Sequence, residues 1–168
     1  SLEELGIPAR IRRGEPLAAT GAGRVALELL PLAEQGFPAG AVARLLSGRY
    51  LPEVSAGEGI GALLALAAVR DDLLGAEGRR GAYEVRLSRL AERLDRQGSS
   101  AKAEAARRLQ ESASKLMEAV RAIPGQGRAA ELLAGWWRCL TALGLQGALL
   151  RPEPRAWARR RTSRRTRS

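Results

Sequence analysis

The chain has 168 residues, which suits one domain or part of a larger one; 45% are hydrophobic and only 4% aromatic, so a core must be built from Leu, Ala and Val. Histidine is absent, and Cys139 is the single cysteine. These facts exclude Ser-His-Asp triads, Cys-His pairs, histidine metal sites and disulfide frameworks within this chain. Ala, Leu, Arg and Glu dominate and favour helix, whereas runs of strand-forming residues are nearly absent.

The formal net charge of +10 is unevenly distributed along the chain. Residues 151–168 hold eight arginines and one glutamate, which gives +7 and leaves +3 for residues 1–150. We therefore divide the sequence into a helical segment, 1–150, and an Arg-rich tail, 151–168. Such a tail attracts phosphate without sequence preference, and it is also typical of a disordered end. A frameshift in GC-rich coding DNA yields similar runs of Arg, Ser and Thr, so a tail that is not native sequence is a third interpretation.

The N-terminal residues indicate a piece of a longer protein. Residues 1–5 have the pattern of a helix end, and Gly6 would stop that helix. Alternating apolar residues then predict one short β-strand over about 7–13. Because a lone strand is unstable, it needs a sheet that this chain does not supply. The start at Ser1 shows neither a methionine nor a signal peptide, which fits the middle of an open reading frame.

Helical periodicity covers most of the remaining chain. Thr20 is expected to cap a helix to about Gln35, and Pro38 to open another. Further helices are expected over 60–74, 82–97, Ser99 or Ser100 to about Ile123, and about 127–143, with Gly144 as the last stop. No apolar run reaches the roughly 18 residues of a membrane span. The predicted core positions in these helices are Val25, Leu29, Leu32, Val42, Leu45, Leu46, Leu63, Leu66, Val69, Val85, Leu87, Leu90, Leu94, Ala105, Leu109, Leu116, Val120, Leu132, Leu133, Trp136, Trp137 and Leu140.

The candidate catalytic motifs are incomplete. The stretch 21–23 (Gly-Ala-Gly) lacks the Gly-Lys-Ser/Thr of a phosphate loop, and the glycine-rich stretch 57–61 lacks a strand–turn–helix setting. Helix capping and an ordinary loop are the favoured interpretations. Asp71 and Asp72 point about 100° apart on a helix, so a solvated helix end is favoured over paired carboxylates. We predict no catalytic residue, no metal site, and no ATPase or nuclease activity of this chain alone.

Arginines are the candidate DNA-binding residues. Arg79 and Arg80 lie between glycines beside Tyr83, an arrangement that could hold a phosphate backbone or stack a base, although an ordinary exposed loop is favoured. Three more arginines flank the predicted strand. The candidate set is Arg10, Arg12, Arg13, Arg79 and Arg80, and its alternative interpretation is solvated surface. The paired rings at 136–137 are expected to pack in the core or at a domain interface.

Several segments resemble a recurring part of bacterial helicase–nuclease proteins. They are residues 5–10 (LGIPAR), 13–18 (RGEPLA), 36–38 (GFP), 42–47 (VARLLS), 50–51 (YL), 68–72 (AVRDD) and 81–87 (GAYEVRL), with weaker similarity to residue 145. The family is that of the AddB-type subunits of ATP-dependent helicase/nuclease enzymes, a branch of the PD-(D/E)XK nuclease proteins. The resemblance covers about residues 1–150, and 4–52 most specifically. The tail departs from the family pattern.

The resemblance implies a mainly α multi-helix segment of a larger helicase-like α/β protein that lacks the helicase core and the nuclease domain. Its expected role is scaffolding and nonspecific DNA-backbone contact in a cytoplasmic, DNA-end-processing helicase–nuclease of recombinational double-strand break repair. ATP and Mg²⁺ would act elsewhere in the parent protein, with no cofactor in this segment. The expected partners are DNA, the rest of the parent chain and a partner helicase–nuclease subunit. The alternative is a non-enzymatic helical module that binds nucleic acid or acidic partners through its tail.

Overall fold

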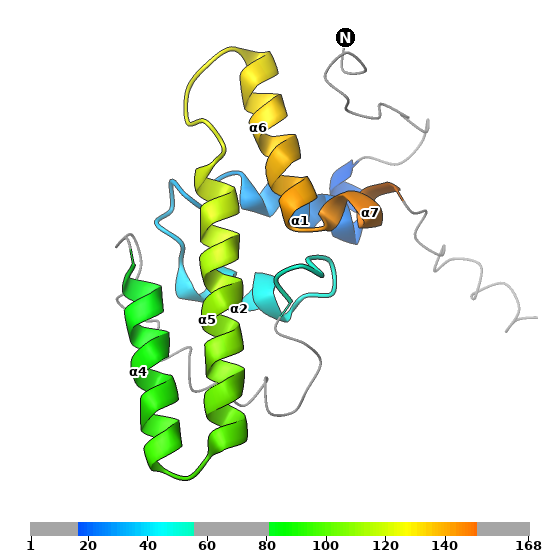
Figure 1. Ribbon diagram of the computed structural model, residues 1–168. Coiled ribbons are helices and arrows are strands. Elements are labelled where there is room, and N and C mark those ends of the chain that lie inside the picture. Colours follow the sequence, from blue (N-terminus) through cyan, green and yellow to red (C-terminus); the bar gives the residue numbers. More distant parts are fainter. Residues whose placement is uncertain (1–16, 56–80, 151–168) are drawn as a thin grey trace, which may run out of the picture.

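Helices account for nearly all the regular structure of the computed structural model, which describes residues 17–55 and 81–150 (Figure 1). No strand occurs within these two ranges. The mainly α fold class is therefore confirmed for them, while the predicted strand over 7–13 and the predicted helix over 60–74 lie outside the described residues. The elements are a short 3-10 helix η1 (Leu17–Ala19), α1 (Gly21–Leu29), α2 (Ala39–Ser47), α4 (Ala82–Arg96), α5 (Ser100–Arg121), α6 (Ala129–Ala142) and α7 (Leu145–Leu150).

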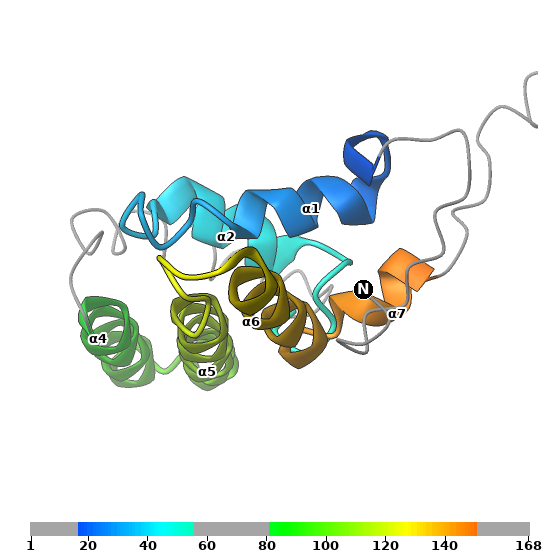
Figure 2. The ribbon, with the colours of Figure 1, turned by 90° about the horizontal axis from the view of Figure 1, so that it is seen from above.

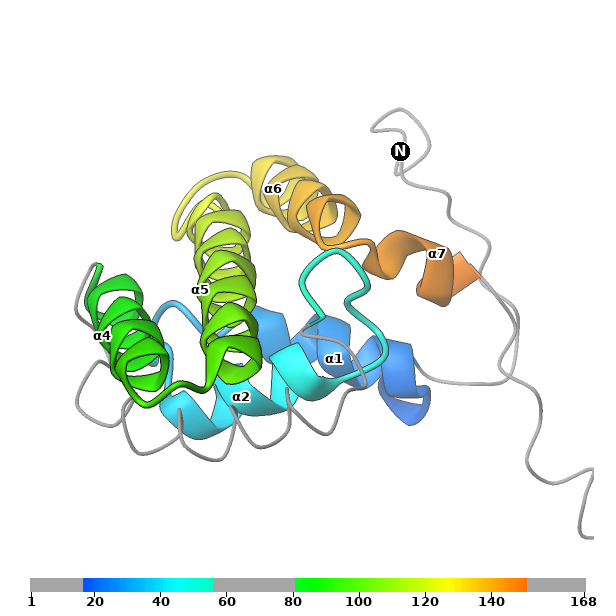
Figure 3. The same ribbon diagram turned by 60° about the horizontal axis from the view of Figure 1, so that its bottom comes forward.

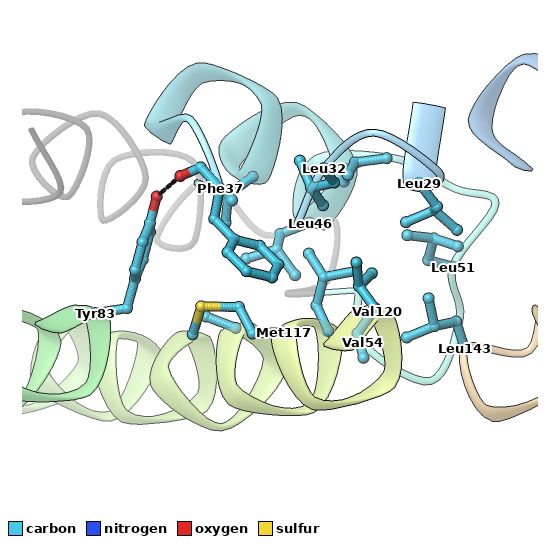
Figure 4. Packing of buried hydrophobic residues seen from close by; sticks show 14 of the residues in the cluster. Leu29, Leu32, Phe37, Leu46, Leu51, Val54, Tyr83, Met117, Val120 and Leu143 are labelled. Atoms are coloured by element: carbon cyan, nitrogen blue, oxygen red, sulfur yellow. Dashed lines mark hydrogen bonds between the residues drawn. The ribbon is translucent and has the colours of Figure 1, made fainter. Parts of the chain in front are cut away.

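The helices form two layers. Figure 2 shows α1 and α2 in one layer, lying across α4, α5 and α6 in the other. The two longest helices, α4 and α5, make an antiparallel hairpin whose turn includes Gly98 at φ +70°. Figure 3 shows α7 continuing from the end of α6 at one side of the molecule, where it also contacts α1. The core fills the space between the layers (Figure 4).

The start of α1 follows the sequence prediction, but its end does not. The Thr20 side chain accepts a hydrogen bond of 2.9 Å from the backbone N–H of Gly23, which confirms the predicted N-cap. The glycine-rich stretch 21–23 is thus the first turn of a helix. The predicted extension to Gln35 is wrong, because α1 ends at Leu29. Pro31 has no N–H to donate to the carbonyl of Leu27, so the helical ladder cannot continue through it.

A glycine-based turn brings the chain into α2. Gly36, at φ +70°, donates its N–H to the carbonyl of Ala33, and Phe37 donates to that of Leu32. This pair of bonds is the Schellman arrangement, which requires a left-handed residue and favours glycine there. The turn places Phe37 in the core at 4% exposure although its own φ is +57°. A positive φ is unfavourable for a bulky residue, so surrounding contacts must hold Phe37 in place.

Two contacts hold Phe37 between the layers. Tyr83 of α4 is 1% exposed, and its hydroxyl donates a hydrogen bond to the carbonyl of Phe37 (Figure 4). The guanidinium of Arg121, at the end of α5, lies 4.9 Å from the centre of the Phe37 ring, within cation–π range. Residues from three separate stretches of the chain therefore meet at one point.

The predicted core is largely confirmed, with two corrections. Leu29, Val42, Leu87, Leu109, Leu116, Val120 and Leu140, among others, are each 2% exposed or less. The predicted core positions Val85 and Leu133 are wrong, since these side chains are 50% and 38% exposed. Leu133 lies at the edge of the buried face of α6, and Val85 lies on the side of α4 opposite to the buried Tyr83 and Leu87. The predicted core positions 63, 66 and 69 lie outside the described residues.

Replacing Tyr83 with Phe tests the contact between Tyr83 and Phe37. The Tyr83→Phe variant keeps the ring but removes the donor, so the buried carbonyl of Phe37 loses this hydrogen bond. We expect unfolding free energy to fall by about 1–3 kcal/mol in urea titrations followed by circular dichroism. Tyr83→Leu, which also removes the ring, should lose more. Equal stability of Tyr83→Phe and the unchanged chain would show that the hydrogen bond contributes nothing.

Gly144, between α6 and α7, is a second sensitive position. It has φ +74°, and an added Cβ would lie 2.8 Å from Cγ of Pro52 and 2.9 Å from Cγ of Glu53. We expect Gly144→Ala to lower thermal stability, with a cost of about 1–3 kcal/mol. Gly147 in α7 is the matched control, because a Cβ there meets nothing within 4 Å. Gly147→Ala should be neutral or stabilising, and equal effects at both positions would contradict this explanation.

Candidate nucleic-acid interface

The predicted DNA-binding residues cannot be placed together by this structure. Arg10, Arg12 and Arg13 precede the first described range, and Arg79 and Arg80 fall in the gap before α4. The tail, 151–168, also lies outside the described residues. Among the described residues, the arginines of α4 form the most distinctive basic group, and the sequence analysis did not single them out.

The arginines of α4 lie on one side of the helix. Arg86, Arg89, Arg93 and Arg96 follow the spacing i, i+3, i+7 and i+10. At 3.6 residues per turn, this spacing places all four within an arc of about 80°. Arg89, Arg93 and Arg96 are exposed, and Arg86 is partly exposed. We call these four residues the α4 arginine row.

Two of the three carboxylates of α4, those of Glu84 and Asp95, lie on a different flank, against α5. The hydroxyl of Ser114 on α5 donates a hydrogen bond of 3.0 Å to the Glu84 carboxylate. Arg107 on α5 forms an ion pair with Asp95 near the turn of the hairpin. The same helical geometry puts the arginine row roughly 150° around the helix from Glu84 and Asp95. The row therefore faces away from α5, while Glu92, the third carboxylate of α4, is exposed beside the row.

An open depression of about 410 Å³ runs beside the row. Its lining residues are Glu84, Val85, Ser88, Arg89, Glu92 and Gln110, so it combines two carboxylates with one arginine. A depression that is open to solvent and lined by this mixture of charges does not resemble a small-molecule pocket. The depression lies between the arginine row and the contact of α4 with α5.

Several other cations of the described helices are engaged in pairs. Arg44 on α2 forms an ion pair with Glu28 on α1, and the hydrogen bond from Arg44 to Glu28 raises the pKa of the guanidinium. Lys115 lies 2.8 Å from Glu111 one turn earlier on α5, and their hydrogen bond lowers the pKa of Glu111 and raises that of Lys115. Such exposed pairs add little stability, but they reduce the local charge excess. In the α4 arginine row, Arg86 and Arg93 also interact with other groups of the protein, while Glu84 and Asp95 of the same helix face α5.

The tryptophan pair serves packing. Trp136 and Trp137 are both partly buried and pack against the core cluster. The indole N–H of Trp136 donates a hydrogen bond of 3.2 Å to the carbonyl of Ala26 on α1. This bond links the two layers, so core packing, the favoured interpretation of the sequence pattern, accounts for Trp136.

Acidic residues and the single cysteine were the remaining candidates for metal binding or nucleophilic chemistry in the described residues. No group of three or more Asp, Glu or Cys residues there could hold a metal ion. Cys139 is buried in α6 at 2% exposure, and burial raises the pKa of its thiol to about 11. A buried thiol with a raised pKa holds little thiolate near neutrality, so it is a poor nucleophile. No helix of the described residues is both long and apolar enough to cross a membrane.

Comparison with known proteins does not identify a relative. No protein-family model matches the chain, and no curated sequence or solved structure matches it either. The class that the structure itself defines is a two-layered helical protein with an arginine row on its edge helix.

The state of Cys139 can be measured directly. We expect the native chain to react slowly with a thiol reagent such as DTNB at pH 8, since burial hides the thiol and raises its pKa to about 11. Unfolding in guanidinium should release one fast-reacting thiol, because the chain holds a single cysteine. Rapid labelling of the native protein would contradict the buried position in α6.

Proposed function

We propose that this chain is a helical, non-catalytic part of a cytoplasmic DNA-end-processing helicase–nuclease that acts in recombinational double-strand break repair. Its role is scaffolding together with sequence-independent contact with the DNA backbone. In this proposal the strand predicted over 7–13 pairs with a sheet of the parent α/β protein, and ATP, Mg²⁺ and the catalytic residues act elsewhere in that parent. The proposal rests on the resemblance of about residues 1–150, most specifically 4–52, to AddB-type subunits, and on the helical architecture.

The charge of the chain is the observation that favours DNA as a partner. The formal net charge is +10, and the tail alone supplies +7. Arginine side chains neutralise phosphates and release condensed counterions, which gives affinity without sequence preference. In the parent protein, Arg10, Arg12, Arg13, Arg79 and Arg80 are the proposed contacts, because the sequence predicts that a strand and a glycine-bounded loop hold them in place. The tail composition also favours the alternative function, a helical module that binds acidic partners.

The test compares DNA affinity at several salt concentrations for the full chain and for a chain that ends at Leu150. We expect the full chain to bind duplexes of unrelated sequence equally well. Removing the tail, with its charge of +7, should weaken binding strongly and reduce the slope of log K against log salt by up to about 6.

Each outcome bears on a different part of the proposal. No DNA binding by the full chain would overturn the DNA contact. Unchanged affinity and salt slope after removal of the tail would show that the tail is not the main contact of the isolated chain. If the shortened chain binds no DNA, contact through the helical body loses its support and only the scaffolding role survives.

A further inference from the structure

We propose that the α4 arginine row is the surface through which the folded helices bind the backbone of double-stranded DNA. This inference rests on the DNA-binding function proposed above. It names the residues of the described helices that make the contact: Arg86, Arg89, Arg93 and Arg96.

The length of the row fits one strand of a duplex. From Arg86 to Arg96 is ten residues, or about 15 Å of helix at 1.5 Å per residue. One strand of B-DNA presents a phosphate about every 3.4 Å along the axis, but it also winds around that axis, so a straight row of about 15 Å meets fewer than four successive phosphates. Arg89 and Arg96, about 10 Å apart along α4, can each reach a phosphate of the same strand. Contacts of this kind position the protein without reading sequence.

The orientation of two of the three carboxylates of α4 leaves an excess of positive charge on the row. Glu84 and Asp95 are turned toward α5, where they interact with Ser114 and Arg107. Their negative charge is therefore directed away from a ligand on the row. Glu92 is exposed near the edge of the row and is the nearest carboxylate on the same helix. The excess of positive charge that remains on this side of α4 favours the binding of a polyanion, because summed surface charge raises the local concentration of an oppositely charged partner.

A duplex fits this surface better than an anionic membrane. A helix that binds a membrane surface needs an exposed apolar face beside its basic residues, which it inserts into the lipid. The apolar face of α4 is already used, because Tyr83, Leu87 and Leu90 are each 2% exposed or less. Val85, at 50% exposure, is the large apolar side chain of α4 that remains accessible. One valine supplies too little area for stable insertion.

Arg89 and Arg96 are the best positions for a test. Both are exposed, and neither forms an ion pair among the residues that the structure describes. The Nε of Arg96 donates a long hydrogen bond of 3.4 Å to the carbonyl of Glu92, which leaves its charge unneutralised. Arg86 and Arg93 also interact with other groups of the protein, so changing them carries a greater risk of altering the fold.

The experiment uses the full chain and two variants with equal loss of charge. The row variant is Arg89→Gln with Arg96→Gln, and the control variant is Lys102→Gln with Arg108→Gln on α5, where both residues are exposed. Affinity for a fluorescent duplex is measured by anisotropy from low to moderate salt. We expect the row variant to lose about tenfold in affinity near 0.1 M salt and about 2 in salt slope, as for two lost phosphate contacts. The control variant should change either quantity far less.

Two further measurements keep the result interpretable. Circular dichroism and thermal unfolding must show that both variants fold like the unchanged chain, which exposed Arg→Gln changes should permit. Flotation with phosphatidylserine-containing vesicles tests whether the row binds an anionic membrane instead of DNA. Loss of vesicle binding in the row variant without loss of DNA binding would overturn the assignment to DNA.

The remaining outcomes separate this inference from the proposed function. If the unchanged chain binds DNA and the row variant matches the control, the row is not the contact, but the DNA-binding function stands. If the unchanged chain binds no duplex at any salt concentration, the proposed function and this inference both fail. The assignment is supported if the row variant alone loses affinity for DNA, and loses it equally for two duplexes of unrelated sequence.

Discussion

Burial of the apolar stripe of α5 is the constraint on which the described structure depends. This helix of 22 residues lies in the middle of its layer, between α4 and α6, with α2 across it (Figure 2). Small alanines along the stripe let α4 approach closely, and larger side chains near its end fill the space under α1 and α2. The buried residues are Ala103, Ala105, Ala106, Leu109, Ala113, Leu116, Met117 and Val120.

The position of α5 sets how the charges of α4 are distributed. A helix at the edge of a layer has one flank against its neighbour and one flank free of it. In α4 the first flank carries Glu84 and Asp95, which pair with groups of α5, and the second carries the arginine row. Because the apolar face is buried at the same time, the arginines are held on a rigid helix. Cations on a rigid helix lose less conformational freedom on binding than cations on an unfolded segment would.

The contact between Phe37 and Tyr83 shows how the two layers are joined in a core with few aromatic residues. A turn closed by Gly36 presents the backbone carbonyl of Phe37 to the hydroxyl of a buried tyrosine, 46 residues away in sequence. Among the described residues no buried side-chain polar atom lacks a hydrogen-bond partner. The polar connections between layers, including that from Trp136 to Ala26, thus stabilise the packing without leaving unpaired groups.

Local sequence was sufficient to locate where most helices begin and which residues share a face, because capping and 3.6-residue periodicity act over a few neighbouring residues. Thr20, Gly81 and Gly144 mark boundaries for this local reason. Only the packing of the helices shows which of these faces are buried. Val85 and Leu133 fit the apolar pattern but lie outside the covered faces, and the spacing of the α4 arginines became informative once α5 was seen to occupy the opposite flank. Coverage depends on residues far apart in the chain, and local periodicity carries no information about them.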